Sequence, residues 1–377
     1  MAHEQGAEIP RVVPDVKKQQ KEKTLGWAST ATVPVAKITN CVGVWEKELK
    51  DDPDKEFILN GIRNGFRLID LKATPVPSNT NNYKSATVEN KDAAEKQIYE
   101  EIRNGRYIVS DTPPPIISSL GAIPKKNGDV RLIHDFSRPE GGVNQHASDT
   151  SVVYPTVEEA TKMMNNEVFL AKIDLASAYR SIPLYPSCYS LTGLKWQFGN
   201  NDRNTFLFDA RLPFGVACSC RIFQALTDSI VRMMERRQVK CRGYINDFLL
   251  TYAESKAALS TMTLLIASLG LNINWSKVEG PSTALTFLGV QINTVTRTLA
   301  LPEEKLWAVK QTLEQWATKQ KAKKLDIQSL VGHLNWCARV IAGGRSFLRN
   351  IIDLIGKARH PYHYVRLGAA AKGDLAW

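Results

Sequence analysis

The chain has 377 residues, of which 43% are hydrophobic, so it can bury a substantial core and is not a disordered tail. Its formal net charge of +11 favours a polyanionic partner, and nucleic acid is the commonest one, although a solvated basic surface would give the same charge. Residues 302–377 carry 13 Lys and Arg against 6 Asp and Glu, so the positive charge is concentrated in this segment.

The six cysteines include no CxxC pair, and the six histidines include no HExxH pattern. We therefore expect reduced, mostly structural cysteines in an intracellular protein, cytoplasmic or nuclear and not secreted. The chain shows no signal segment and no apolar run long enough to cross a bilayer, so we expect no membrane partner.

The first 90 residues predict an N-terminal extension that is partly disordered. Residues 1–25 are polar and lack periodicity, so we expect them to be mobile. Residues 40–72 have mixed apolar content, and the Pro/Asn/Ser-rich residues 74–82 predict a linker or long loop. An apolar stripe then predicts a helix from Asp92 to Arg103.

Residues 120–133 predict two strands around a turn at Asn127-Gly128, which is a strong hairpin signal. Lys125, Lys126 and Arg131 lie on its arms, and an ammonium or a forked guanidinium suits triphosphate oxygens. The hairpin is thus a candidate phosphate clamp, with a merely solvated basic hairpin as the alternative.

A carboxylate follows the next predicted strand. Thr156 and Glu159 form a capping-box pattern that opens a helix to about residue 166, and the apolar run 168–173 then leads to Asp174. A short helix should follow, which would carry Tyr179 either into the core or into the wall of a site.

A second candidate group lies on a hairpin at 243–250. A rigid turn, 212–216, leads into a long helix, 217–237, and the hairpin then presents Asn246 and Asp247 at its tip. An ordinary turn is the simplest interpretation of the hairpin alone. With Asp174 at another strand end, however, two carboxylates could meet and hold divalent metal ions.

The remaining pattern predicts an α+β fold with an antiparallel sheet. A helix from about Glu254 to Leu269 should end at Gly270, and strands are expected over 286–292 and 298–301. From Pro302, taken as the first helical residue, the pattern is purely helical, with a second helix capped by Asp326 and a third at 345–355. These helices predict a small basic subdomain.

Taken in order, these motifs resemble those of reverse transcriptases over residues 95–377. The resemblance is carried by the basic hairpin, Asp174 with Tyr179, the turn at 212–215, the hairpin at 244–247, Lys277 after Leu269-Gly270-Leu271, and 287–290. It looks closest to the DIRS-like retrotransposons that bear a tyrosine recombinase. The cues for that group are residues 131–137, 330–335, 343–349 and 374–377.

The resemblance implies a right-hand polymerase with fingers, an antiparallel-sheet palm and a helical thumb. The fingers would be residues 91–155, the palm 156–301 with a fingers contribution, and the basic thumb 302–377. The thumb would end at the start of a connection to an RNase H domain. Implied partners are an RNA or DNA template–primer duplex and dNTPs, and the implied cofactor is a pair of Mg²⁺ ions, with Mn²⁺ as an alternative.

The resemblance also implies a role for individual residues. Metal would be held by Asp174, Asp247 and the Leu175 carbonyl. The nucleotide would contact Lys125, Arg131, Phe214 and Gly215, with Tyr179 excluding a ribose 2′-hydroxyl. Lys277 would donate a proton to the leaving pyrophosphate, and the primer grip would be Phe287, Leu288 and Gly289.

One position departs from the family pattern Tyr-x-Asp-Asp, because Asn246 stands at the first Asp. An amide oxygen is a neutral and weaker ligand for Mg²⁺, so we predict impaired or absent catalysis. The Asn is explained equally by a laboratory substitution, a decayed element copy or a domesticated protein. The function is accordingly an RNA-directed DNA polymerase by lineage, a non-catalytic nucleic-acid-binding protein, or a structural partner in a retroelement assembly.

Overall fold

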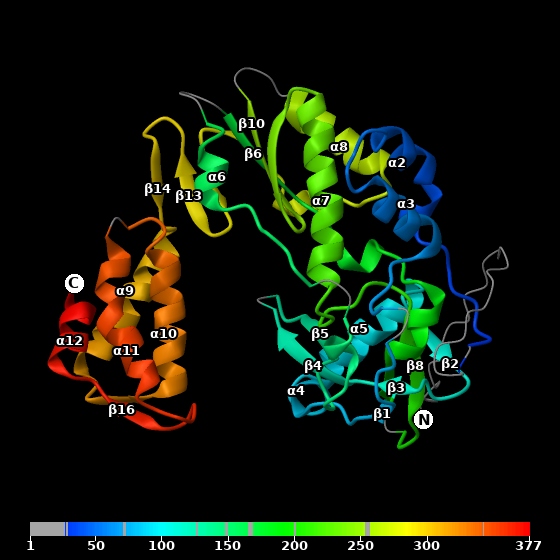
Figure 1. Cartoon of the computed structure of the whole chain (residues 1–377), viewed down its shortest axis with the longest axis horizontal. Helices are drawn as coiled ribbons and strands as arrows, with labels where there is room; N and C mark the ends of the chain where they lie inside the picture. Colours follow the sequence, from blue (N-terminus) through cyan, green and yellow to red (C-terminus); the bar gives the residue numbers. More distant parts are fainter. Residues whose placement is uncertain are drawn as a thin grey trace, which may run out of the picture. The chain divides into compact units, whose positions relative to one another are not determined.

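The computed structural model describes residues 27, 29–70, 73–125, 127–147, 150–164, 169–199, 201–252, 257–341 and 343–377. Two compact units divide the chain (Figure 1). Unit 1 comprises Met1–Pro155, Ile173–Leu250 and Ser255–Val278, and unit 2 comprises Thr156–Lys172, Thr251–Glu254 and Glu279–Trp377. The segment expected to be mobile, 1–25, and Lys126 of the basic hairpin lie outside the described residues.

Unit 1 begins with three helices, α1 (Lys37–Asn40), α2 (Val42–Glu48) and α3 (Lys55–Asn64). The indole of Trp45 is fully buried and donates to the Leu269 carbonyl at 2.9 Å. Asp52 accepts from the Arg232 guanidinium at 2.7 Å. Figure 1 shows α2 and α3 beside α7 and α8, so this part of the predicted extension belongs to the core of unit 1.

The predicted helix and basic hairpin are both confirmed. Helix α5 (Lys91–Arg103) buries its apolar stripe, and β4 (Ser119–Pro124) pairs antiparallel with β5 (Val130–Asp135) around Gly128, which has a φ of +83°. One buried cluster joins the helix to this hairpin: Ala94, Ile98 and Ile102 of α5 with Leu120, Ala122, Val130 and Leu132. The hairpin is therefore anchored to α5 by this shared buried cluster.

A five-stranded sheet completes this part of unit 1, in the order β1-β3-β7-β8-β2. Its strands are β1 (Ser78–Asn79), β2 (Tyr107–Ser110), β3 (Ile116–Ile117), β7 (Gly193–Trp196) and β8 (Thr205–Asp209). Short helical segments connect them: α4 (Lys84–Thr87), η1 (Val143–Gln145), η2 (Tyr179–Ser181) and η3 (Pro186–Leu191). Figure 1 places the sheet beside α5.

The other part of unit 1 is built on α7 (Ser219–Arg236), whose predicted stripe is buried. It packs against the hairpin of β9 (Lys240–Tyr244) and β10 (Asp247–Tyr252), and β10 neighbours the end of β6 (Phe169–Asp174). Helix α8 (Ala257–Ser268) ends as predicted, because Gly270 has a φ of +79° and the Leu271 amide donates to the Ile266 carbonyl at 3.2 Å. The segment η4 (Trp275–Lys277) follows.

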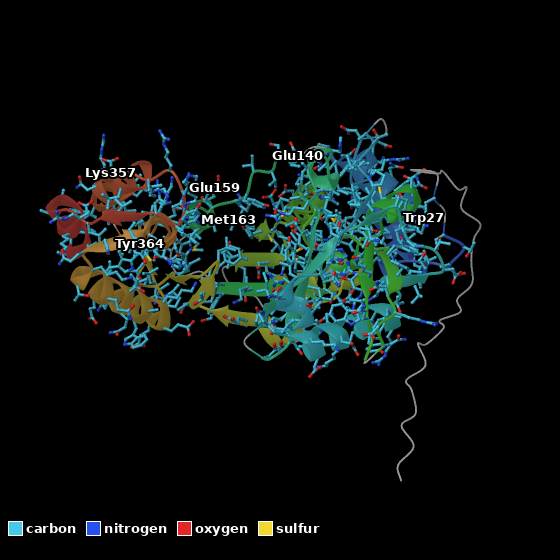
Figure 2. All side chains as sticks on the ribbon, turned by 90° about the horizontal axis from the view of Figure 1, so that it is seen from below. Trp27, Glu140, Glu159, Met163, Lys357 and Tyr364 are labelled. Atoms are coloured by element: carbon cyan, nitrogen blue, oxygen red, sulfur yellow. The ribbon has the colours of Figure 1, made fainter. Side chains whose placement is uncertain are left out.

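In unit 2, α6 (Val157–Thr161) has the predicted capping box. The Thr156 hydroxyl accepts from the Glu159 amide at 3.2 Å, and the Glu159 carboxylate, labelled in Figure 2, accepts from the Thr156 amide at 2.9 Å. Strand β11 (Glu279–Ser282) pairs antiparallel with the first part of β6. Helix α6 ends at Thr161, whereas the sequence predicted a helix that continued to about residue 166.

The strand expected over 286–292 was wrong, because this segment is a hairpin. Strands β12 (Ala284–Phe287) and β13 (Val290–Asn293) pair around Leu288 and Gly289, whose φ angles are +47° and +81°. Two positive φ values are what a two-residue hairpin turn requires. Strand β14 (Thr298–Ala300) completes a three-stranded sheet.

The rest of unit 2 is helical: α9 (Glu303–Thr318), α10 (Lys324–Cys337), η5 (Gly344–Leu348), α11 (Arg349–Gly356) and α12 (Ala369–Ala376). They enclose a buried cluster that includes Trp316, Ile327 and Leu354. A two-stranded ribbon of β15 (Lys321–Lys323) and β16 (Tyr364–Arg366) crosses one end of the helices in Figure 1. Pro302 is the N-cap of α9 rather than its first residue.

The assignment of Asp326 as the N-cap of the second helix was also wrong. Helix α10 begins at Lys324 directly after β15, and Asp326 lies inside its first turn. The amides of Lys324 and Leu325 donate to the His363 and Pro361 carbonyls at 2.9 and 2.8 Å. A neighbouring chain segment thus satisfies amides that a capping side chain would otherwise serve.

Over the described residues, no helix combines the length and the apolar character that a membrane span requires.

Candidate active site

Asp174 ends β6 and has an exposed fraction of only 5%. Its Oδ2 accepts from the Asn246 side-chain amide at 3.0 Å and from the Lys277 ammonium at 3.2 Å. Its Oδ1 accepts from the Asn274 side-chain amide at 3.2 Å. The structure therefore brings Asp174, Asn246 and Lys277 together, as the sequence predicted, and surrounds the carboxylate with donors.

The hairpin tip is held by its main chain. The Ile245 amide donates to the Gln224 side chain at 2.8 Å, and the Ile245 carbonyl accepts from the Thr227 hydroxyl. A Cβ at Gly243 would lie 2.4 Å from the methyl group of Thr227, a residue of α7. Glycine at position 243 therefore allows α7 to pack this closely against the hairpin. The Asn246 carbonyl accepts from the Leu175 amide at 2.9 Å, which sets the tip beside the end of β6.

Asp247 is the first residue of β10, immediately after the Asn246 tip, and its side chain is half-buried. Among the described residues, no group of three or more His, Cys, Asp or Glu side chains could hold a metal ion. The oxygen-bearing groups on these neighbouring segments are the Asp174 and Asp247 carboxylates, the Asn246 amide and the Leu175 carbonyl. These are the oxygen ligands that Mg²⁺ prefers, so the set fits the ion but has one negative charge fewer than the family pattern.

Tyr179 and Phe214, both expected at the nucleotide, are in contact, with ring centroids 5.2 Å apart. The Arg131 guanidinium lies 5.4 Å from the centre of the Phe214 ring. The Tyr179 hydroxyl donates to the Cys220 thiol at 3.2 Å. Burial, together with this hydrogen bond, raises the pKa of Tyr179 well above its ordinary value, so the ring carries a neutral hydroxyl.

Gly215 has a φ of +112°, and a Cβ there would lie 1.9 Å from the His134 carbonyl oxygen. The Phe214 carbonyl accepts from the His134 amide at 3.1 Å, so this turn and β5 are bound together. Lys125, in contrast, is exposed beyond the end of β4, and its amide donates to the Asp129 carbonyl at 2.7 Å. Of the two clamp residues that the structure describes, Lys125 and Arg131, it is therefore Arg131 that lies at the Phe214 ring.

The expected primer-grip residues form the β12–β13 turn of unit 2. Phe287 is 1% exposed and pairs with Val290 across the hairpin. A Cβ at Gly289 would lie 2.4 Å from the Lys305 ammonium and 2.9 Å from the Trp336 ring, so the turn packs closely on α9 and α10.

Sequence reasoning missed two contacts of the site. Asn274 was not singled out, although it lies three residues before Lys277 and could have been examined with it. Cys220 belongs to the six cysteines that were expected to be mostly structural, and no spacing in the sequence indicates its hydrogen bond with Tyr179.

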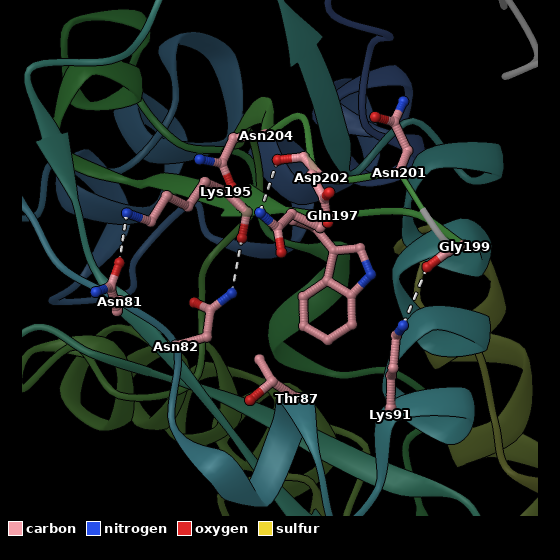
Figure 3. A pocket seen from close by; sticks show the side chains of 11 residues that line it. Asn81, Asn82, Thr87, Lys91, Lys195, Gln197, Gly199, Asn201, Asp202 and Asn204 are labelled. Carbon is pink, nitrogen blue, oxygen red and sulfur yellow. Dashed lines mark hydrogen bonds between the residues drawn. The ribbon is translucent and has the colours of Figure 1, made fainter.

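A polar cavity of about 540 Å³ in unit 1 was not predicted either (Figure 3). Two lysines line it, and both are bound to protein groups. Lys195 donates to Asn79 and Asn81 at 2.8 Å, and Lys91 donates to the Gly199 carbonyl at 3.0 Å. None of the residues that line the cavity belongs to the group described around Asp174.

Residues 123–292 match the family described as reverse transcriptase (RNA-dependent DNA polymerase). This part of the chain is thus similar to a reverse transcriptase domain. The chain is 28% identical over 203 residues to the retrovirus-related Pol polyprotein from transposon opus of Drosophila melanogaster, covering 52% of this chain and 19% of that protein. It is 23% identical over 244 residues to the Gag-Pol polyprotein of Avian reticuloendotheliosis virus, covering 62% and 20%. The chain thus spans about a fifth of the length of these relatives.

Two solved structures of the foamy viral protease–reverse transcriptase, each in complex with double-stranded DNA, have the same fold with TM-scores of 0.63. The first is 17% identical and covers 96% of this chain and 61% of that chain, and the second is 15% identical and covers 93% and 71%. The expected α+β polymerase fold is thereby confirmed for the reverse transcriptase domain and its surroundings.

Proposed function

We propose that this domain has the architecture of an RNA-directed DNA polymerase that extends a primer with dNTPs, and that Asn246 impairs or abolishes the reaction. The observation that carries the proposal is the environment of Asp174. Its Oδ2 accepts from the Asn246 amide at 3.0 Å and from Lys277 at 3.2 Å. An Asp at position 246 would replace one of these donors by a second anion.

Asp174, Asp247 and the Leu175 carbonyl would hold Mg²⁺ or Mn²⁺, with the Asn246 amide oxygen as a weak further ligand. The ions, when bound, would stabilise the charge that develops on the entering and leaving oxygens of phosphoryl transfer. This chain's own contribution is to fix the hairpin tip beside β6 through the Leu175 and Ile245 main chain. The missing carboxylate lowers the attraction for those ions.

The nucleotide would contact Arg131, Lys125 and the Tyr179–Phe214 pair, with the neutral Tyr179 ring excluding a 2′-hydroxyl. The ring contacts at 5.2 and 5.4 Å support this set for Tyr179, Phe214 and Arg131. Lys277 would carry the proton for the leaving pyrophosphate. In unit 2, Phe287, Leu288 and Gly289 would hold the primer.

Primer extension on an RNA template tests the proposal. We expect Asn246→Asp to raise the rate about 10²- to 10³-fold with Mg²⁺, which is the usual effect of one electrostatic contact at a transition state. Asp174→Asn in the Asn246→Asp background is the matched control and should remove the gain. Equal, robust incorporation by the unchanged chain and Asn246→Asp would refute the proposed impairment.

A second function, non-catalytic binding of nucleic acid, is favoured by one specific observation. The Asp174 carboxylate accepts from three protein donors, the Asn246 and Asn274 side-chain amides and the Lys277 ammonium. Both functions predict salt-dependent affinity for a template–primer duplex, so incorporation, not affinity, separates them. The foamy viral structures, which contain double-stranded DNA, support a duplex as the partner.

The DIRS-like grouping is part of the proposal, together with an RNase H domain downstream. Its support is the set of motifs at 131–137, 330–335, 343–349 and 374–377. A tyrosine-recombinase gene beside the coding sequence would support the grouping, and an integrase gene of the retroviral type in its place would contradict it.

A further inference from the structure

A surface of unit 2 outside the proposed polymerase site has an unusual charge pattern. We call it the basic ribbon and define it as residues 319–324 and 357–366, which include β15 and β16. It contains seven Lys and Arg and no Asp or Glu, whereas residues 302–377 as a whole contain 13 and 6. More than half of the cations of this region thus lie in two segments that contain no carboxylate.

The strand register places like charges opposite each other. Lys321 pairs with Arg366, Ala322 with Val365, and Lys323 with Tyr364. Ala322 and Val365, in the middle of the two strands, are buried. The side chains before and after them are exposed, because successive side chains of a strand point to opposite faces. Like charges directly opposite in a sheet are destabilising, and this ribbon has only two strands to hold them. A polyanion laid on the outer face would relieve the repulsion.

Exposed aromatic rings lie among these cations. Tyr364, labelled in Figure 2, is 59% exposed, and the Lys321 and Lys323 ammonium groups lie 5.3 and 5.8 Å from its ring centre. Tyr362 is 66% exposed, and the ring of His360 stacks on it at 5.6 Å and 7°. Cations that follow a phosphate chain, beside aromatic rings on which bases stack, are the features of a single-strand binding surface.

We propose that the basic ribbon binds single-stranded nucleic acid, with Lys321 and Arg366 on its phosphates and Tyr362 as a stacking platform for a base. A duplex offers phosphates but keeps its bases covered, so it would not use the aromatic rings. The positive charge of the two segments, which contain no Asp or Glu, accounts for the phosphate attraction. This binding is independent of polymerase activity and of the side chain at position 246.

Fluorescence anisotropy with a labelled oligouridine tests the proposal on the full chain at several salt concentrations. The variant is Lys321→Ala with Arg366→Ala, and the matched control is Lys47→Ala with Lys50→Ala, two exposed lysines of unit 1 that give the same net charge. Loss of two phosphate contacts should reduce the slope of log affinity against log salt by about 1.4. Tyr362→Ala should weaken binding about fivefold or more.

Specificity and folding need their own measurements. Affinity for a blunt DNA duplex should be the same in the ribbon variant as in the control, and Lys321→Arg with Arg366→Lys should retain the original salt slope and melting temperature. Ultraviolet cross-links to the oligonucleotide should include the peptide that contains Tyr362 and Tyr364. An unchanged slope, cross-links confined to other peptides, or an equal loss of duplex affinity would each overturn the proposal.

Discussion

At position 246, an amide and a carboxyl group have nearly the same shape and differ in charge. The Asn246 amide donates to the Asp174 Oδ2, which also accepts from Lys277. Aspartate cannot donate there, and it would add a negative charge beside a carboxylate that is 5% exposed. The exchange of one residue therefore converts a hydrogen bond into a repulsion.

We therefore expect Asn246→Asp to lower the free energy of unfolding by about 1.5–3 kcal/mol in the presence of a chelator, because a hydrogen bond to a charged group is lost. Added Mg²⁺ should restore stability in this variant by mass action and change the parent chain much less. Urea unfolding with EDTA and with Mg²⁺ measures both effects. Identical responses of the two proteins to Mg²⁺ would contradict the assigned ligands.

His134 predicts a pH dependence of stability. Burial, followed by the charge of Arg180, lowers the pKa of His134 from 6.5 to about 3. As the pH falls through 6.5, the unfolded chain takes up a proton that the folded chain excludes, so stability is lost between about pH 6.5 and pH 3. The loss should be about 2 kcal/mol between pH 7.5 and pH 5.

The matched variant is His134→Gln, which is neutral and can still bond to Tyr107, whose hydroxyl lies 2.9 Å from the His134 Nε2. Its free energy of unfolding, measured by urea titration at both pH values, should vary by about 2 kcal/mol less than that of the parent. If both proteins lose the same stability, His134 is not the responsible group.

The residues of the site were partly predictable. Asp174, Asn246 and Lys277 could be found because each follows an apolar run or belongs to a recognisable motif, and the structure joins them. Cys220 could not, because its bond to Tyr179 joins residues 41 positions apart through the packing of α7. Sequence patterns show periodicity within one element, whereas the contact between Tyr179 and Cys220 depends on how two elements pack against each other.

At the scale of elements, Arg180 joins three parts of unit 1. Its guanidinium is 2.7 Å from Glu101 of α5 and 2.5 Å from Asp209 of β8, and it also donates to the Leu212 carbonyl at 3.3 Å. Arg180 directly follows Tyr179, and Leu212 opens the turn that carries Phe214. The buried charges thus hold together the two segments that present the expected nucleotide contacts.

Removing this guanidinium would take from the Asp209 side chain, which is 0% exposed, its ion-pair partner at 2.5 Å, and would leave Glu101, 7% exposed, with the ion pair to Arg106 at 3.0 Å. Arg180→Met should therefore lower the free energy of unfolding by about 3–5 kcal/mol. Arg203→Met, at an exposed position of unit 1, is the control and should change it by less than about 0.5 kcal/mol. Chemical denaturation followed by tryptophan fluorescence measures both, and equal small changes would contradict the role of Arg180.

Elements with strong periodicity were predicted well, and those decided by single backbone angles were not. The buried stripes of α5 and α7 follow from spacing alone. The β12–β13 turn was missed because Leu288, a residue that rarely adopts a positive φ, does so at +47°. Asp326 was misassigned because a neighbouring segment, rather than a side chain, serves the first amides of α10.

At the scale of the molecule, unit 1 is assembled from segments far apart in the sequence. Arg232 of α7 binds Asp52, whose side chain is 0% exposed, at 2.7 Å, and Asp54 at 2.8 Å. Trp45 reaches the Leu269 carbonyl. Composition indicated only that a core exists. It could not indicate which segments form that core, because this depends on contacts between residues more than 170 positions apart in the sequence.

Arg232→Met should therefore loosen the N-terminal helices, since the Asp52 carboxylate would keep only the Ser229 hydroxyl and the Asp54 amide as described donors. We expect a loss of about 2–3 kcal/mol and faster trypsin cleavage within residues 37–64. Arg242→Met, whose partner Glu235 is exposed, is the matched control. Cleavage at equal rates in both variants would show that the ion pair does not hold these helices.

The way the hairpin is held has an evolutionary consequence. Gln224, Thr227 and Leu175 fix its tip through main-chain atoms, so the fold does not require a particular side chain at position 246. With asparagine there, two groups of the protein itself, the Asn246 amide and the Lys277 ammonium, bind the Asp174 Oδ2. Under the proposed function, nucleotide chemistry could then be lost and regained through this one residue without a change in the fold that carries it.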